Sequence, residues 1–394
     1  MALAARNLYM NDKSPVGPLL SDTHIAALYL IACALNRALP DSAFVASLDH
    51  GSLYKFAVSQ NVDAMLGWVL SLTDCGEMNA RWKAAYNHSV RKTMLFDSER
   101  SKVFSFLEEN KIWHMPLKGI LMKDLYPVYG MRQMADNDIL FDSKYAAAVK
   151  DFFVGLGYEC NCNDLSNHDV YHKQPFFNFE MHRFLFHRAT PFYDYYREVE
   201  SRLHKDTDKA YSFHFSKEDF YVYLYLHFAK HLHGSGTGIR SLADLYLYRT
   251  HHPNLDSSYI SGELALFDLA QEEQFIQKLT RKLFSEPTPG FLSLLNPEEE
   301  TFLLQFLTNG TYGTMKNRLS NALSRYDESS KFARKLRFIK DRLLPDFEEK
   351  LPYYPAFFSR HKWTKPLFYL YRIFSCLILN RKELWKEITS LIRL

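Results

Sequence analysis

The stretch from Met78 to Asn110 constrains the fold most, because it contains neither glycine nor proline. Apolar residues such as Trp82, Val90 and Leu107 mark one face along it. A run of this length without helix breakers predicts a single long helix with one buried face. At residue 111 the pattern changes to short apolar runs bounded by turn residues. We therefore expect a helical region followed by a region that contains strands.

Composition sets the class of protein. The chain has 394 residues, enough for two or three structural units with a core that needs no disulfides. Apolar residues make up 47% and charged residues 24%, which excludes wholesale disorder, a collagen-like fibre and a coiled-coil rod. Glycine and proline, at 15 each, argue against a large turn-rich β architecture. The formal net charge of +3 indicates no class of partner.

The cysteines and the apolar runs bear on the compartment. The five cysteines are an odd, scattered set that is not a disulfide framework and suits a reducing cytoplasm. A zinc site that uses Cys160 and Cys162 is an alternative, but no second pair of ligands has a matching spacing. We expect no signal peptide, because residues 1–17 lack a long apolar run. We also expect no membrane span, because the best apolar candidate, 366–379, is short and contains Arg372.

The order of the predicted elements indicates an α+β fold. Besides the long helix, helices are predicted at 22–35, 53–72, 120–126, 143–156, 220–232, 240–248, 260–284, 297–307, 314–344 and 367–391. Strands are predicted at 112–117, 136–141, 158–161, 169–172 and 176–184. Pro116 places the first strand at a sheet edge. We therefore predict a small mixed sheet core at 111–205, between helical regions at 1–110 and 206–394.

Two carboxylates stand two positions apart on the second predicted strand, in the sequence Asp136-Asn137-Asp138. Residues i and i+2 of a strand point to the same face, so both carboxylates lie close together. An ionised pair of this kind repels and is costly to bury, and Mg²⁺, which prefers oxygen ligands, relieves the repulsion. The pattern therefore predicts a site for Mg²⁺ and a triphosphate, with Mn²⁺ as the alternative ion. A solvated strand edge is the alternative without a ligand.

A third carboxylate lies on the last predicted strand. The alternation in 176–184 places Glu180 and His182 on one face and aromatic residues on the other. A charge in the middle of a half-buried strand needs a partner. A metal ion that is already bound by the aspartate pair would serve, and an ion pair with Arg183 is the alternative.

The turn that precedes the aspartate pair has features of a phosphate site. Lys118 and Gly119 follow the first strand, where a glycine lets a phosphate approach the backbone and a lysine supplies positive charge. Arg132 stands four residues before Asp136 and is a second candidate cation. A surface charge is the alternative for Arg132.

In this order the motifs resemble a known family. The matching residues are Leu117-Lys118-Gly119, Tyr126-Pro127, Arg132, Asp136-x-Asp138, Glu180-x-His182, His227-x-x-x-His231 and Asp244-Leu245. They are similar to the uncharacterised bacterial nucleotidyltransferase-like family of the DNA polymerase β superfamily, and the likeness covers most of residues 20–250. It implies a polymerase β-like core in which Asp136, Asp138 and Glu180 form the metal triad.

Two positions depart from the wider superfamily. Its phosphate turn has Gly-Ser or Gly-Gly where this chain has Lys118-Gly119. Asn137 stands where the strand is expected to present an apolar residue to the core. A buried asparagine must find hydrogen-bond partners there.

The later helices add weaker candidates. His227, Lys230 and His231 share a predicted helix, which we interpret as lining the cleft and contacting the nucleotide. A zinc site on this helix is an alternative that lacks a third ligand. Arg240 and Asp244, one helical turn apart, are cleft candidates or a structural pair. The segment 316–342 has nine basic and three acidic residues, which suits either an anionic partner such as RNA or a solvated helix face.

The preferred hypothesis is a cytoplasmic nucleotidyltransferase of the EC 2.7.7 type. It would move a nucleoside monophosphate from a nucleoside triphosphate to an unidentified acceptor and release pyrophosphate. The alternatives are a nucleotide- or RNA-binding regulator of the same fold without turnover, as in a toxin–antitoxin pair, and a structural interaction protein. A nucleic acid is not the favoured partner, and the sequence selects neither the acceptor, the nucleotide nor the oligomeric state.

Overall fold

The computed structural model describes residues 20–162, 166–310, 313–324, 326, 328, 330–345, 347, 362–378 and 381–393. They form two compact units. The larger unit consists of the described residues of Ser14–Phe228 and Gly238–Thr311, and the smaller unit of those of Ala229–Thr237 and Tyr312–Leu394. The division of the sequence at residues 110 and 205 stays a prediction.

The larger unit begins with helices. Ser21 caps the first of them in a capping box with His24, as expected for a serine at this position. The stretch without glycine or proline is the single helix α6 (Asn79–Glu109), which confirms that prediction. The helices that precede it are α2 (Asp22–Leu35), α3 (Ser42–Ala46), α4 (His50–Gln60) and α5 (Asp63–Leu70).

Several predicted long helices are each two helices. The single helix predicted at 53–72 is wrong, because Asn61 takes a left-handed conformation with φ 54° and ends α4. Asp268, with φ 59°, likewise lies between α11 (Ser257–Ala265) and α12 (Ala270–Phe284). In the smaller unit the predicted helices at 314–344 and 367–391 are α14 (Met315–Leu323), α15 (Lys331–Leu343), α18 (Lys365–Ile378) and α19 (Arg381–Arg393).

A five-stranded mixed sheet is the centre of the larger unit. Its strands are β1 (His114–Pro116), β2 (Asn137–Phe141), β3 (Glu159–Asn161), β4 (His168–Lys173) and β5 (Phe177–His182), in the spatial order β1-β2-β5-β4-β3. β2 and β5 run parallel, and the other neighbours are antiparallel. Pro116 lies in an edge strand, as its missing N–H requires.

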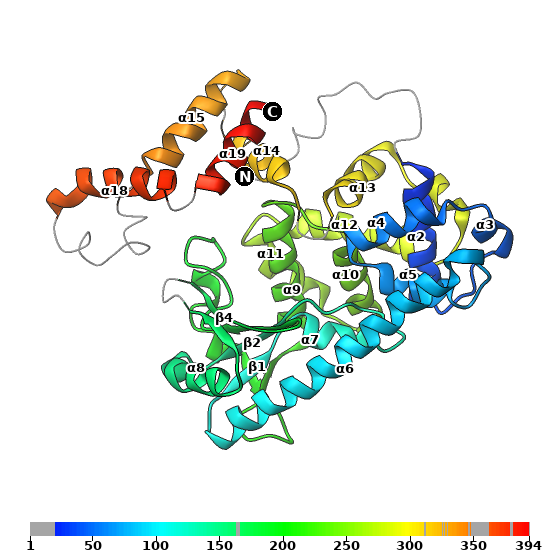
Figure 1. The fold of residues 1–394 in the computed structure, drawn as a ribbon, viewed down its shortest axis with the longest axis horizontal. Coiled ribbons are helices and arrows are strands. Elements are labelled where there is room, and N and C mark those ends of the chain that lie inside the picture. The colour runs from blue at the N-terminus through cyan, green and yellow to red at the C-terminus, as the bar shows by residue number, and fades with distance from the viewer. Residues whose placement is uncertain are drawn as a thin grey trace. The chain divides into compact units, whose positions relative to one another are not determined.

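One face of the sheet packs on helices. The core side chains of β2 and β5 include Ile139, Phe179 and Met181, which join a cluster with Phe96 of α6 and Phe153 of α8 (Ala146–Gly155). Figure 1 shows α6 and α8 beside the sheet. Because side chains alternate along a strand, the neighbouring residues of β2 and β5 point to the other face. This alternation is the one that the sequence predicts.

Further helices complete the larger unit. A two-stranded sheet of β6 (Leu203–Lys205) and β7 (Phe213–Phe215) leads into α9 (Lys217–Leu232), and Ser216 accepts a hydrogen bond from the Asp219 backbone N–H at its start. The remaining helices are α10 (Arg240–His251), α11, α12 and α13 (Pro297–Asn309). A small mixed sheet with helical flanks confirms the predicted α+β class.

The structure shows the state of four cysteines and bears on the prediction about membrane spans. Cys160 and Cys162 are joined by a disulfide, a pairing that the sequence interpretation did not include. Cys33 and Cys75 are free and buried. In the described part of the chain, no helix combines the length and the apolar character that a membrane crossing needs.

Candidate active site

The parallel pair β2 and β5 brings two of the predicted carboxylates together. Asp138 of β2 is the register partner of Glu180 of β5. Both residues lie on the face that points away from the aromatic core, and His182 follows two positions later on the same face. Glu180 keeps 23% of its side chain exposed and Asp138 only 4%, so solvent reaches the group from the Glu180 side.

Asp138 is held by two basic side chains. Its Oδ1 lies 2.8 Å from Nε2 of His182 and accepts a hydrogen bond of 3.2 Å from Nζ of Lys118. Burial alone would raise the pKa of Asp138, but Lys118 and His182 outweigh it and keep this pKa well below its usual range. Burial would lower the pKa of Lys118, but the combined attraction of Asp138, Tyr223, Asp136 and Glu180 outweighs burial and raises this pKa. Asp138 is therefore ionised throughout the physiological range.

The Lys118 turn has an unusual backbone. Lys118 has φ 36° and ψ −109°, a region that non-glycine residues rarely occupy and that costs about 1–3 kcal/mol. The Leu117 N–H donates to the Asp138 carbonyl at 3.0 Å, and the Met122 N–H donates to the Lys118 carbonyl at 2.8 Å. These bonds hold the turn against β2 and aim the ammonium group at Asp138.

Gly119 is closely packed. A Cβ at this position would lie 2.9 Å from Nη1 of Arg132 and 3.2 Å from Cε of Met134. A side chain there would therefore force the ends of these two side chains to shift.

Asp136 directly precedes β2 and stands next to this ionised group. Burial and then the charge of Asp138 raise the pKa of Asp136 to about 6. The positive charges of Lys118 and Arg240 act in the opposite direction. The pKa values of these two neighbouring carboxylates are pushed apart by their repulsion, and a divalent cation bound between them would relieve that repulsion.

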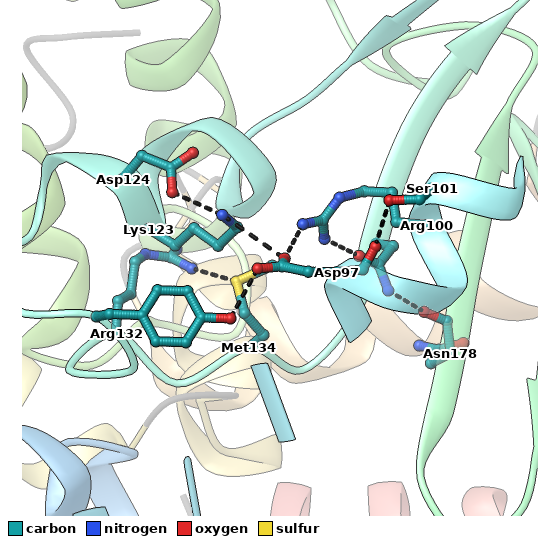
Figure 2. A network of polar contacts seen from close by, with 10 residues as sticks. Asp97, Arg100, Ser101, Lys123, Asp124, Arg132, Met134 and Asn178 are labelled. Atoms are coloured by element: carbon teal, nitrogen blue, oxygen red, sulfur yellow. Dashed lines mark hydrogen bonds and ion pairs between the residues drawn. The ribbon is translucent and has the colours of Figure 1, made fainter. Parts of the chain in front are cut away.

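Asn137 finds its partner on the core side. Nη1 of Arg100, from α6, donates to Oδ1 of Asn137 at 2.6 Å, and Asn137 donates to the Asn178 carbonyl at 3.4 Å. Arg100 is itself paired with Asp97, as Figure 2 shows. Asn137 is completely buried, so the hydrogen bond with Arg100 satisfies the polar group that the sequence places in an apolar position.

Arg132 and Asp244 form a buried ion pair. Nε and Nη2 of Arg132 donate to the two carboxylate oxygens of Asp244, each at 2.8 Å, and the Tyr126 hydroxyl donates to Oδ1 at 2.8 Å. Asp244 therefore pairs with Arg132, and Arg240 donates instead to the Gln133 carbonyl at 2.9 Å. A nucleotide contact by Arg132 stays a prediction.

Helix α9, which contains His227 and His231, has residues in both units. His227 lies in the α9 part of the larger unit, with its ring centre 6.4 Å from that of Tyr223. Lys230 and His231 follow in the last turn of α9, which belongs to the smaller unit. Their contact with a nucleotide stays a prediction.

Three residues near the carboxylates were missed by the sequence interpretation. Burial lowers the pKa of Lys92 of α6, and the negative charge of Asp136 acts in the opposite direction. His168 of β4 places Nε2 3.7 Å from Oε2 of Glu180. Tyr223 of α9 interacts electrostatically with Lys118, Asp138 and Glu180, and burial raises its pKa. No local motif marks these residues, because three separate elements bring them to the site.

Asp136, Asp138 and Glu180 offer carboxylate oxygens, the kind of ligand that Mg²⁺ prefers. The ligand atoms found within 4.8 Å of one another in the described part of the chain are those of His168, Glu180 and His182, so the metal triad stays a prediction. Within the described residues, the buried hydroxyl of Tyr223 has no hydrogen-bond partner, which leaves it available to a ligand. Lys92, Lys118 and Arg240 surround Asp136 with positive charge, which suits an anionic substrate.

The fold and the site thus have the form of a nucleotidyltransferase: a small mixed sheet between helices, with acidic residues on neighbouring strands. A family model described as an uncharacterised nucleotidyltransferase matches residues 46–285, and the chain belongs to this family. The resemblance inferred from the motifs is therefore confirmed. No curated protein and no solved structure gives a match to the chain.

Proposed function

We propose that this protein transfers a nucleoside monophosphate from a nucleoside triphosphate to an acceptor, with Mg²⁺ bound by Asp136, Asp138 and Glu180. The observation that carries the proposal is the register pairing of Asp138 with Glu180, with Asp136 directly before the strand that contains Asp138. Family membership supports nucleotidyl transfer as the class of reaction.

In the proposed reaction an acceptor oxygen attacks the α-phosphorus. A bond forms between these two atoms, and the bond from the α-phosphorus to the bridging oxygen of pyrophosphate breaks. The metal supplies charge stabilisation of the attacking and leaving oxygens. Glu180, the more exposed partner of the register pair, is assigned to accept the proton of the acceptor.

Lys118 has the second role in this proposal. Its ammonium group lies at the carboxylates on a turn whose backbone is held in place by β2. A buried lysine of this kind neutralises triphosphate charge as a point charge. Lys92 and Arg240 add positive charge on the Asp136 side.

Labelled nucleotides test the proposal. The purified chain would be incubated with each α-phosphate-labelled nucleoside triphosphate, Mg²⁺ and a small-molecule extract, and both label transfer and pyrophosphate would be measured. We expect transfer with wild type and with Asp151→Asn, an exposed change on α8, but not with Asp138→Asn. Equal transfer by wild type and Asp138→Asn would refute the assignment.

One observation favours a second candidate, a nucleotide-binding protein without turnover. The Lys118 ammonium group already compensates the charge of Asp138, which a metal ion would otherwise do. Calorimetry with ATP in the presence and absence of Mg²⁺ separates the two functions. Binding that is independent of Mg²⁺, with no pyrophosphate from any triphosphate, would favour the binding protein.

A further inference from the structure

Two histidines and one carboxylate meet beside the aspartate pair. His168, Glu180 and His182 each offer a ligand atom, and these atoms all lie within 4.8 Å of one another. His168 of β4 and His182 of β5 are register partners, with ring centres 5.0 Å apart. The antiparallel pairing of β4 with β5 therefore sets this geometry, and no flexible loop is needed to form it.

The distances are close to those of a metal site. Oε2 of Glu180 lies 3.7 Å from Nε2 of His168 and 3.7 Å from Nε2 of His182. Ligand atoms of a tetrahedral ion with bonds of about 2.0–2.1 Å stand roughly 3.3 Å apart. Oδ1 of Asp138 lies 2.8 Å from Nε2 of His182 but also accepts a hydrogen bond from Lys118, so the cluster has three protein donors and leaves the fourth position of the ion to water or a ligand.

One of the two histidines, His182, has a supporting contact on its second ring nitrogen. The Asn167 amide lies 3.4 Å from Nδ1 of His182, on the side opposite to Asp138. Nδ1 of His168 is buried and has no hydrogen-bond partner within the described residues. A polar partner on the second imidazole nitrogen fixes ring orientation in metal sites.

We propose that His168, Glu180 and His182 bind a divalent transition ion of the Zn²⁺ and Co²⁺ class. Two imidazole nitrogens favour such ions over Mg²⁺, which prefers oxygen ligands. The site differs from the oxygen-only pair of Asp136 and Asp138 in its nitrogen donors, and it shares Glu180 with the proposed triad. The inference concerns metal binding alone and does not require nucleotidyl transfer.

Cobalt is the probe of this site, because its visible absorption reports the ligands directly. The full chain, without a histidine tag and after treatment with a chelator, would be titrated with Co²⁺ and then with competing Zn²⁺. We expect one equivalent of Co²⁺ to give a visible band, Zn²⁺ to remove it, and millimolar Mg²⁺ to leave it unchanged. Displacement of Co²⁺ by an equal concentration of Mg²⁺ would overturn the inference.

Variants identify the ligands. His168→Ala and His168→Gln should each weaken Co²⁺ binding by more than about tenfold. His172→Ala, at an exposed position of the same strand, should leave it unchanged. Melting curves establish that each variant is folded, and the more conservative glutamine is used if the alanine variant is not. Unchanged Co²⁺ binding in a folded His168 variant would overturn the inference.

The transition-metal site and the transfer function can each be refuted without the other. If His168→Gln binds Co²⁺ as wild type does while pyrophosphate release depends on Asp136, the transition-metal site is refuted and the transfer function stands. If Co²⁺ binding requires His168 but no triphosphate is turned over, the metal site stands and the transfer function is refuted.

Discussion

Asp138 and Glu180 occupy register-partner positions on two parallel strands, and this pairing brings together carboxylates that are 42 positions apart in the chain. Each side chain leaves the sheet on the face opposite to the aromatic core. The main-chain hydrogen bonds of the sheet therefore fix the spacing of the acidic groups. The following predictions test what this arrangement does.

The first prediction concerns turnover. Asp136→Asn and Asp138→Asn should each lower the rate of label transfer by roughly 10²-fold or more, because each removes one charged metal ligand. The rate would be measured at saturating Mg²⁺ and triphosphate, with the fold checked by circular dichroism. Asp151→Asn serves as the control. Retention of wild-type rates by both site variants would show that these carboxylates do not bind a catalytic metal.

The same two substitutions should change stability in opposite directions when metal is absent. Asp138→Asn leaves the largely buried Lys118 without its ion-pair partner, and we expect a loss of roughly 3–5 kcal/mol in the free energy of unfolding. Asp136→Asn removes a carboxylate that is repelled by Asp138, so the protein should become more stable. Urea denaturation in a chelating buffer measures both. A stability change of the same sign in both variants would contradict the electrostatic description.

A pH dependence follows from the pKa of Asp136. Because the folded pKa of about 6 lies above the ordinary value of 3.8, the folded state binds a proton more tightly than the unfolded state. This group should therefore add stability as the pH falls from about 7 to about 4, with an upper limit of about 3 kcal/mol. The measurement compares the metal-free unfolding free energies of wild type and Asp136→Asn at several pH values. A constant difference across this window would exclude the raised pKa.

Arg132 and Asp244 should contribute mainly to folding. Arg132→Met breaks a buried two-point ion pair and leaves Asp244 charged, and the expected cost is about 3–5 kcal/mol. Arg132→Lys should recover only part of it, since a lysine cannot make both hydrogen bonds. Denaturation and triphosphate affinity would be measured in parallel. Weaker affinity without any loss of stability would instead support the phosphate contact predicted from the sequence.

Gly119→Ala tests the packing of the Lys118 turn. The new methyl group would meet Nη1 of Arg132 and Cε of Met134, and overpacking of this kind costs about 1–3 kcal/mol. The shift of the turn should also move Lys118 and weaken triphosphate binding. Gly155→Ala is a suitable control, because a Cβ at that position meets no atom within 4 Å. Equal stability and affinity of the two variants would show that the turn tolerates a side chain.

The sequence predicted those features that depend on local pattern. The absence of helix breakers predicted α6, and the alternation in β5 predicted that Glu180 and His182 share a face away from the core. The motif order predicted the family, which the family model confirms. These predictions succeed because helix propensity and strand alternation act over a few neighbouring residues.

Local pattern was insufficient at single residues of unusual conformation. Asn61 and Asp268 interrupt helical patterns through a left-handed backbone that neither residue type requires. From the sequence, Asn137 is an unexplained polar residue in an apolar strand, and only the structure shows its hydrogen bond with Arg100 of α6. In each position the surrounding packing decides the conformation.

The sequence by itself determined the class of fold, the candidate carboxylates and the family. The tertiary structure decided which groups surround them: Lys118 and His182 hold Asp138, Asp244 pairs with Arg132, and His168 joins Glu180. The physical reason is that electrostatic interactions depend on distance through space, whereas a motif records only distance along the chain. Strand register and helix packing bring residues that are far apart along the chain close together in space.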